Sequence, residues 1–90
     1  MAVFVAGELD LVEAGEFRAV LADACAGSHH TVIVDLSGVT FIASSGLGVL
    51  ASQSHRLTAE GRTLQISGCP RGVLRAFEVT GLDQVLDITS

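Results

Sequence analysis

Hydrophobic and polar positions along this chain follow two alternating periods, and their order predicts strands and helices in turn. Short runs rich in Val, Ile and Phe predict strands. These runs are Ala2–Ala6, Thr31–Leu36, Val39–Ile42, Thr63–Ser67 and Val85–Ile88. Apolar residues at helical spacing predict three helices between them. The helices are expected at about Val12–Ala26, from Ser44 or Ser45 to Glu60, and from near Pro70 to Val79.

The glycines are expected to end the helices, and the most apolar run is expected to be the central strand. Gly27, Gly61 and Gly81 each follow a predicted helix, where a left-handed cap favours glycine. Thr31–Leu36 is apolar almost throughout, which is typical of a strand covered on both faces of a parallel or mixed sheet. A turn is expected at Ser37-Gly38.

Alternating strands and helices predict one α/β domain, residues 1–90, with two or three layers and right-handed crossovers. The chain has no linker and no repeat, and 49% of its residues are hydrophobic, enough for a single core. Each main segment contributes one phenylalanine, and all four are expected in that core. They are Phe4, Phe17, Phe41 and Phe77.

Charge and composition exclude several classes of function. Ten acidic residues against five basic ones give a net charge of −5, and the five basic residues are scattered arginines. Nucleic acid and anionic membrane surfaces are therefore poor partners.

The uncharged stretch 36–55 is long enough to span a bilayer, but its serines and glycines favour a buried strand-to-helix junction instead. No leader pattern precedes Glu8, so we expect a cytoplasmic domain without membrane insertion.

The histidines, serines and cysteines elsewhere in the chain show no pattern that predicts a metal site, a catalytic site or a disulfide. His29, His30 and His55 lack thiol or carboxylate neighbours at metal-ligand spacing, so no metal and no cofactor is expected. A Gly-x-Ser-x-Gly elbow is absent, so we expect no Ser-His-Asp hydrolase. A large substrate cleft would use core that a chain of 90 residues needs for folding, so we expect a binding module and not an enzyme. The two cysteines, Cys25 and Cys69, are expected to be free thiols rather than a disulfide.

The junction around Ser44 and Ser45 carries the informative pattern, because two hydroxyls and two glycines follow a buried strand. A serine at a helix start normally caps it, and the free amides there also favour an anion. Gly46 and Gly48 are expected to let the first turn approach neighbouring backbone closely.

Two acidic residues near predicted strand ends have roles that local chemistry suggests. Asp10 fits an N-cap of the first helix and a partner contact about equally well, and the two roles are compatible. Asp35 is expected to cap the turn through Ser37 and Gly38.

Three motifs in order resemble the STAS domain of bacterial anti-sigma factor antagonists. They are GELD at 7–10, DLSGVTFIASSGLGVL at 35–50 and FEVTGLDQVL at 77–86. The resemblance implies a mixed, mostly parallel sheet with crossover helices. It also implies that the family's short N-terminal strand and C-terminal helix are missing from this sequence, which would leave a sheet edge and an apolar face open for a homodimer or a larger partner.

In function, the resemblance implies a phosphorylation switch at Ser44. The unphosphorylated domain would bind an anti-sigma factor serine kinase and free a sigma factor, and a PP2C-type phosphatase would reset the cycle. Asp10, Ser44, Ser45 and Gly46 would form the partner-binding surface. Ala43 stands where family members usually carry an acidic residue. The alternative is a non-phosphorylated STAS subunit that holds a transporter, for example a phospholipid ABC permease, through a fixed interface.

Overall fold

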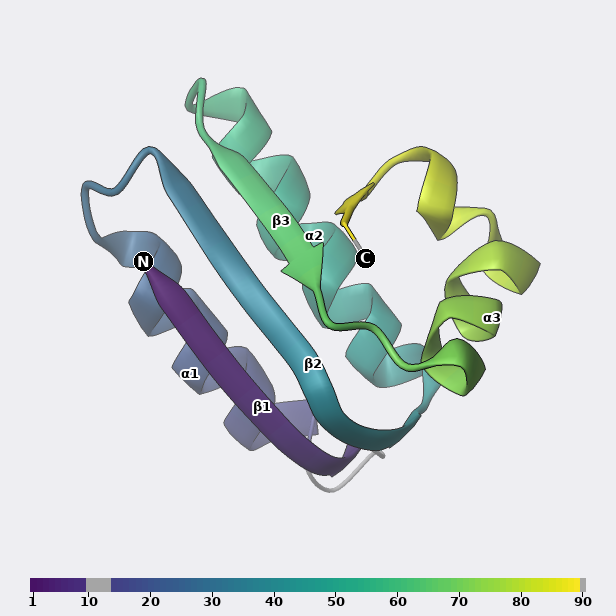
Figure 1. Cartoon of the computed structure of the whole chain (residues 1–90). Helices are drawn as coiled ribbons and strands as arrows, with labels where there is room; N and C mark the ends of the chain where they lie inside the picture. Colours follow the sequence, from purple (N-terminus) through teal and green to yellow (C-terminus); the bar gives the residue numbers. More distant parts are fainter. Residues whose placement is uncertain (10–13, 90) are drawn as a thin grey trace.

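Four parallel strands lie side by side in the order in which they occur in the chain, β1-β2-β3-β4 (Figure 1). The computed structural model describes residues 1–9 and 14–89. The elements are β1 (Ala2–Leu9), α1 (Ala14–Ala26), β2 (Thr31–Ile42), α2 (Ser44–Ala59), β3 (Thr63–Ser67), α3 (Arg71–Thr80), the 3₁₀ turn η1 (Leu82–Gln84) and β4 (Asp87–Ile88). The predicted α/β fold is confirmed, and all the described strand pairs are parallel rather than mixed.

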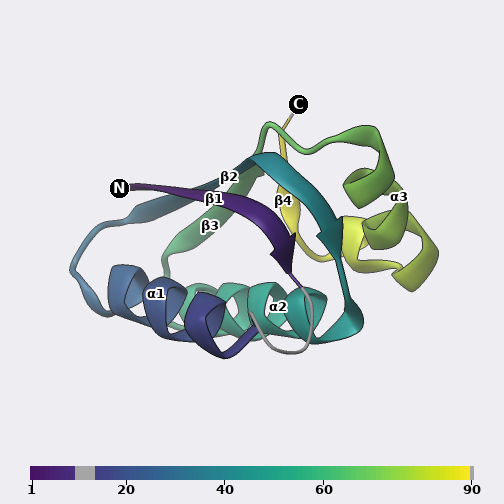
Figure 2. The same cartoon turned by 90° about the horizontal axis from the view of Figure 1, so that it is seen from below.

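Two layers form the domain: α1 and α2 lie together against one face of the sheet, and no helix of the described residues lies across the opposite face (Figure 2). Sequential strand order with right-handed crossovers places these two helices on the same face. The expectation that β2 is covered on both faces is therefore wrong. Val32 and Val34 point to the helices and are fully buried, whereas Ile33 between them is partly exposed.

The predicted turn at Ser37-Gly38 is also wrong, since β2 runs without a break to Ile42. Two register shifts between β1 and β2 let β2 carry extra residues: Phe4 pairs with Asp35, but Ala6 pairs with Gly38. A Cβ on Gly38 would lie 3.0 Å from the Ala6 Cβ, so the glycine serves close strand pairing and not chain reversal.

The shifts change which side chains of β2 face the helices. Leu36, Val39 and Ile42 are buried, a spacing of three that breaks the alternation of a regular strand. The first strand is also longer than predicted, because β1 continues through Gly7 to Leu9. At the other end of the chain the last strand is shorter, since only Asp87–Ile88 pairs with β3.

Two of the four phenylalanines are in the core, and two are not. Phe17 and Phe77 are buried, whereas Phe4 is 78% and Phe41 52% exposed. Phe4 follows the inward-facing Val3 and so points to the face that no helix covers. The core cluster consists of Val3, Leu9, Phe17, Leu21, Ala24, Cys25, Val32, Val34, Leu36, Val39, Ile42, Leu47, Val49, Leu50, Leu57, Leu64, Ile66, Val73, Phe77 and Leu86.

The helix ends only partly follow the sequence prediction. Gly61 (φ +73°) and Gly81 (φ +78°) adopt the expected left-handed conformation after α2 and α3. Gly27 does not, so the predicted glycine cap of α1 is wrong. Instead, the Arg62 guanidinium donates to the Cys25 carbonyl oxygen in the last turn of α1.

Candidate functional site

The start of α2 lies one residue beyond the carboxyl end of β2 and is fixed by backbone hydrogen bonds. Ala43 is the N-cap, with extended backbone (φ −86°, ψ 169°). Its N–H donates to the Leu9 carbonyl oxygen at 2.9 Å, and its own carbonyl accepts from the Leu47 N–H at 3.1 Å. This short connection therefore ties the end of β1 to the first turn of α2.

Ser44 is the first helical residue and not the cap, so the expected serine cap is wrong. No side chain caps this helix in the described residues. Ser44 is exposed, which leaves its hydroxyl facing solvent at the helix start. A hydroxyl in this position is accessible to a modifying enzyme.

Ser45 differs from its neighbour, because its Oγ is buried. Within the described part of the chain this oxygen has no hydrogen-bond partner. The two adjacent serines thus differ in exposure, with Ser44 exposed and the Ser45 Oγ buried.

The two glycines of the first turns have different surroundings. Gly46 is buried, and a Cβ there would lie 2.9 Å from Ile42 Cγ1 and 3.3 Å from Leu9 Cβ. The packing at Gly46 is close, as predicted, but the neighbouring atoms belong to side chains and not to the backbone. Gly48 is exposed, and a Cβ there would meet no atom within 4 Å, so the same expectation is wrong for Gly48.

The electrostatics of this helix start favour an anion. The first turn of α2 contains no acidic residue. The first amides of a helix have no partner inside it, and together with the helix dipole they stabilise negative charge. A phosphate on Ser44 would lie beside these amides.

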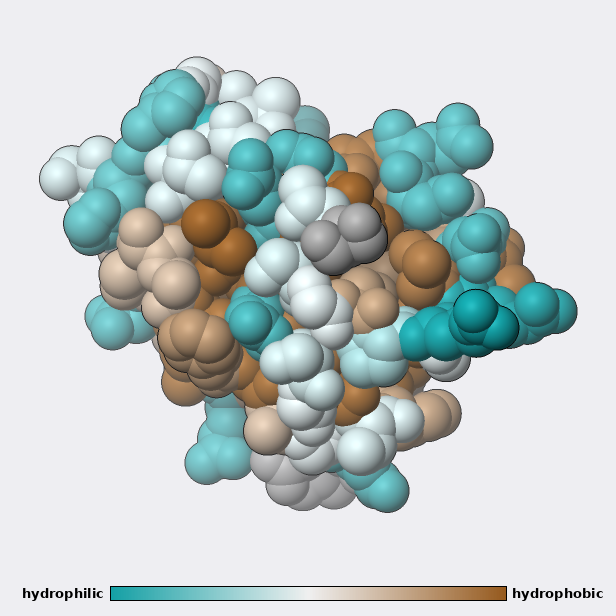
Figure 3. All heavy atoms as spheres, in the orientation of Figure 1, coloured by the Kyte–Doolittle hydropathy of each residue, from teal (hydrophilic) through white to brown (hydrophobic). Residues whose placement is uncertain are grey.

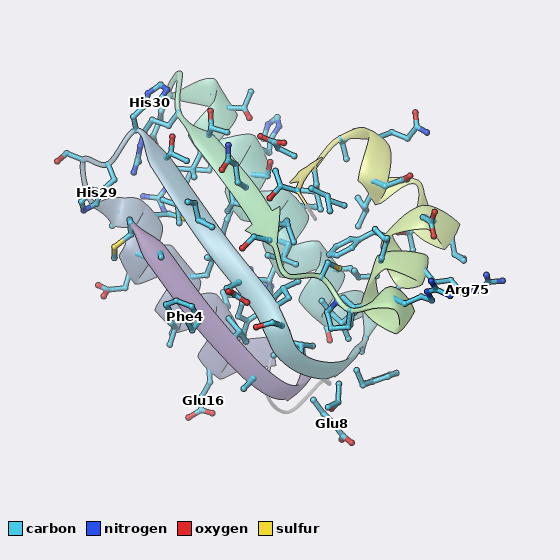
Figure 4. The ribbon with its side chains drawn as sticks, viewed as in Figure 1. Phe4, Glu8, Glu16, His29, His30 and Arg75 are labelled. Carbon is cyan, nitrogen blue, oxygen red and sulfur yellow. The ribbon has the colours of Figure 1, made fainter. Side chains whose placement is uncertain are left out.

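Glu8 and Phe41, at the same end of the sheet, were not predicted as site residues from the sequence. Glu8 of β1 pairs with Phe41 of β2, one step before the Leu9–Ile42 pair next to Ala43, and both side chains are exposed. Figure 4 shows Glu8 pointing outward beyond the end of β1. The register shift that exposes Phe41 has no signature in the local sequence, which reads as an ordinary apolar strand.

The predicted roles of Asp10 and Asp35 fare differently in the structure. Asp10, a predicted N-cap or partner contact, lies outside the described residues. Asp35 Oδ1 accepts a hydrogen bond from the Ser37 N–H at 2.8 Å, so the predicted local bond is confirmed even though the turn is not. Hydrogen bonds from the side chain and then the backbone of Ser37 hold the pKa of this carboxyl below its ordinary value.

Two of the histidines noted in the sequence lie away from the start of α2. His29 and His30 are exposed at the opposite end of the sheet from Glu8 (Figure 4). Cys25 and Cys69 are free thiols, and burial raises the pKa of each.

Over residues 1–9 and 14–89, no group of three His, Cys, Asp or Glu side chains could hold a metal ion. None of the described helices has the length and apolar character needed to cross a membrane.

A family model described as "Mlab, STAS domain" matches residues 1–88. Among curated relatives, an anti-sigma-B factor antagonist of Staphylococcus epidermidis is 31% identical, over 96% of this chain and 80% of the relative. An anti-sigma-F factor antagonist of Mycobacterium tuberculosis is 28% identical, over 96% of this chain and 70% of the relative.

Solved structures give the same picture. An anti-sigma factor antagonist from Mycobacterium paratuberculosis superposes with a TM-score of 0.87 at 30% identity, over 97% of this chain and 74% of that one. SpoIIAA in its unphosphorylated form superposes with a TM-score of 0.79 at 22% identity, over 99% and 78%, a likeness that concerns the fold alone.

Proposed function

This chain belongs to the STAS-domain family of anti-sigma factor antagonists, and we propose that it is a cytoplasmic binding module switched by phosphorylation of Ser44. Unphosphorylated, it binds an anti-sigma factor that is also a serine kinase, and so releases a sigma factor. Phosphorylated, it leaves the kinase until a PP2C-type phosphatase removes the phosphate.

The observation that carries this proposal is the exposure of the Ser44 hydroxyl at the first position of α2. A capping serine would have its oxygen engaged with the backbone. Here Ala43 is the cap residue, so modification of Ser44 breaks no capping bond. The helix dipole and free amides stabilise the added charge.

The proposed effect of the phosphate is electrostatic and local. It adds about −1.5 to −2 charges and three acceptor oxygens at pH 7, and the chain already has a net charge of −5. Glu8 stands exposed at the same end of the sheet. A partner that docks on this surface meets a concentrated negative charge, which opposes binding to any acidic contact.

The first experiment is phosphorylation of the purified chain by its cognate anti-sigma factor and ATP, followed by intact mass and site mapping. We expect one phosphate, on Ser44. Ser44→Ala should abolish it, and Ser45→Ala should retain it because Ser45 Oγ is buried. Phosphate on another residue, or none with a folded chain, contradicts the proposal.

The second experiment measures affinity for the same anti-sigma factor. Ser44→Ala should bind as tightly as the unmodified chain, and Ser44→Asp should bind at least about tenfold more weakly, which corresponds to about 1.4 kcal/mol. Ser52→Asp is the matched control, because Ser52 is an exposed serine further along α2. Equal binding by all three variants rejects the switch.

A second function is a fixed STAS subunit that is never phosphorylated and holds a transporter component. Two points favour it. The matching family model is described as "Mlab, STAS domain". The cap residue before Ser44 is Ala43, at a position where the resemblance given in the sequence analysis implies an acidic residue. Under this alternative no kinase modifies Ser44. Ser44→Asp and Ser44→Ala then bind the partner equally.

A further inference from the structure

The pairing of β1 with β2 shifts register twice before the start of α2, and the two shifts decide which residue lies opposite the end of β1. Ala2 pairs with Ile33, but Leu9 pairs with Ile42, the last residue of β2. In a regular ladder continued from Ala2, Leu9 would stand opposite Thr40. The shifts therefore carry Leu9 two residues further along β2, to the residue just before the cap of α2.

A glycine stands at each of the two shifts. The first lies between Phe4 and Ala6, and there a Cβ on Gly38 would lie 3.0 Å from the Ala6 Cβ. The second lies between Gly7 and Glu8. Gly7 has φ +90°, a conformation that residues with a side chain rarely adopt, while a Cβ there would meet no atom within 4 Å. The chain thus needs glycine for space at Gly38 and for backbone conformation at Gly7.

Leu9, which the second shift sets in place, holds the start of α2 in two ways. Its carbonyl oxygen accepts the Ala43 N–H at 2.9 Å. Its buried side chain lies against the first turn, since a Cβ on Gly46 would be 3.3 Å from the Leu9 Cβ. Ser44 follows Ala43 directly, so the direction of its exposed side chain depends on backbone that Leu9 fixes. Gly7 is thereby connected to Ser44 through the last two residues of β1 and one hydrogen bond.

The shifts have a second effect, because they turn Phe41 outward, where it is 52% exposed. A docking patch built around Phe41 would be a different reason for the shifts. Figure 3, viewed onto the sheet face that no described helix covers, shows hydrophobic and hydrophilic residues interspersed over that face. In this view the described apolar side chains do not gather into one large patch of the kind that marks an interface. Positioning of α2 is therefore the better reason for the shifts.

We propose that Gly7 is a positioning residue for phosphorylation of Ser44. This role rests on the proposed function, in which the Ser44 Oγ attacks the γ-phosphorus of ATP, ADP leaves, and the hydroxyl proton passes to a base of the kinase. Gly7 takes no part in that chemistry. Its left-handed backbone keeps the Leu9 carbonyl beside Ala43, so that the kinase meets the acceptor hydroxyl already held in place. A displacement of about 1 Å in a reacting group can cost about a hundredfold in rate.

The test compares two alanine variants that place the same strain in different parts of the chain. Gly7→Ala and Gly61→Ala each force a side chain onto a positive φ, +90° and +73°, and each new Cβ enters open space. Gly61 lies beyond the opposite end of α2, so it is the matched control. Each variant is incubated with the cognate anti-sigma factor and ATP, well below its unfolding temperature. Gly7→Ala should lower kcat for phosphorylation of Ser44 at least about tenfold, and Gly61→Ala should leave it unchanged.

A second variant removes the same hydrogen bond without altering β1. Ala43→Pro deletes the N–H that donates to Leu9, and the backbone at Ala43 (φ −86°) lies close to the range of proline. It should lower kcat as Gly7→Ala does. The double variant Gly7→Ala/Ala43→Pro should be no slower than the slower single variant, because both changes remove one bond. Losses that multiply would show that Gly7 does not act through Ala43.

Amide exchange gives a readout that does not need the kinase. Gly7→Ala should speed exchange at Ala43 at least about tenfold relative to Val34, which is buried in the middle of β2. Gly61→Ala should leave that ratio unchanged, because a general loss of stability affects both amides.

Three results overturn the positioning role. They are equal kcat values for Gly7→Ala and Gly61→Ala, losses that multiply in the double variant, and an Ala43 amide that stays protected in Gly7→Ala. A folded chain that the kinase does not phosphorylate at all rejects the proposed function instead. Exchange at Ala43 then decides by itself whether Gly7 holds the start of α2.

Discussion

Arg62 Nη1 donates to the carbonyl oxygen of Cys25 at 2.8 Å and thereby joins the residue before β3 to the last turn of α1. The same guanidinium donates through Nε to the His29 carbonyl oxygen at 2.7 Å. One side chain thus satisfies acceptors at the end of α1 and in the following loop. This contact replaces the glycine cap that the sequence pattern favoured.

Arg62→Ala should destabilise the fold by about 1–3 kcal/mol, because it leaves the Cys25 carbonyl without its charged donor. The measurement is urea unfolding, with a lower midpoint and an unchanged slope. Arg56→Ala is the control: Arg56 makes an exposed ion pair with Glu60 at 3.7 Å and should contribute less than about 1 kcal/mol. Equal losses for the two variants would show that Arg62 acts only as a surface charge.

Replacing either glycine of α2 by alanine should change the stability of the fold, but in opposite directions at the two positions. Gly48→Ala should raise stability by about 0.5–1 kcal/mol, since alanine is the better helix former and a Cβ there meets open space. Gly46→Ala should lower stability by about 1–3 kcal/mol, because its Cβ would press against the stiff Ile42 side chain and the Leu9 Cβ. Thermal unfolding of both variants checks this, and a gain at both positions would refute the packing described for Gly46.

Substitution of a buried phenylalanine should lower stability far more than substitution of an exposed one. Phe77→Ala should cost about 3–5 kcal/mol, because the ring is fully buried. Phe4→Ser should change stability by less than about 1 kcal/mol, since the ring is mostly in water already. Chemical denaturation distinguishes the two, and a large loss at Phe4 would mean that something in the domain covers it.

Asp35 should make stability depend on pH in the acidic range. Its folded pKa lies below the ordinary value of about 3.9, so the folded state favours the carboxylate. The stabilisation is fully present above that ordinary pKa and is lost as the pH falls through the folded pKa. Asp35→Asn should therefore flatten the decline below about pH 4. Ser37→Ala, which keeps the backbone donor, should flatten it less, and identical acid profiles for all three chains would contradict the shift.

The fold was predictable from the sequence where local pattern and tertiary structure agree. Thr63–Ser67 forms β3 at its predicted bounds, because a short alternating run between two turn signals has one good interpretation. The α2 start was also found, through the hydroxyls and glycines after a buried strand. Register shifts are different, because they arise from how two strands pair. The exposure of Phe41 and the continuity of β2 at Gly38 therefore could not be read from either strand alone.

The candidate site was predictable in position but not in detail. Ser44 was identified by pattern and resemblance, whereas its place one residue inside the cap depends on backbone geometry at Ala43. The carbonyl of Leu9 that holds Ala43 belongs to a strand predicted to end at Ala6. Side-chain chemistry is readable from a sequence, but a backbone acceptor has no sequence signature.

The hydrogen bonds that fix Ala43 have a consequence for the timing of the proposed switch. The Ala43 N–H donates to the Leu9 carbonyl oxygen, and the Ala43 carbonyl accepts from the Leu47 N–H. The residue before Ser44 is therefore held on both sides, so adding charge at Ser44 requires no rearrangement of its backbone. Loop motions take about nanoseconds to microseconds and collective domain motions about microseconds to milliseconds. A domain whose acceptor needs no such step responds at the moment of modification. Under the proposed function, the duration of the signal would then be set by the rates at which phosphate is added to and removed from Ser44, and not by relaxation of this chain.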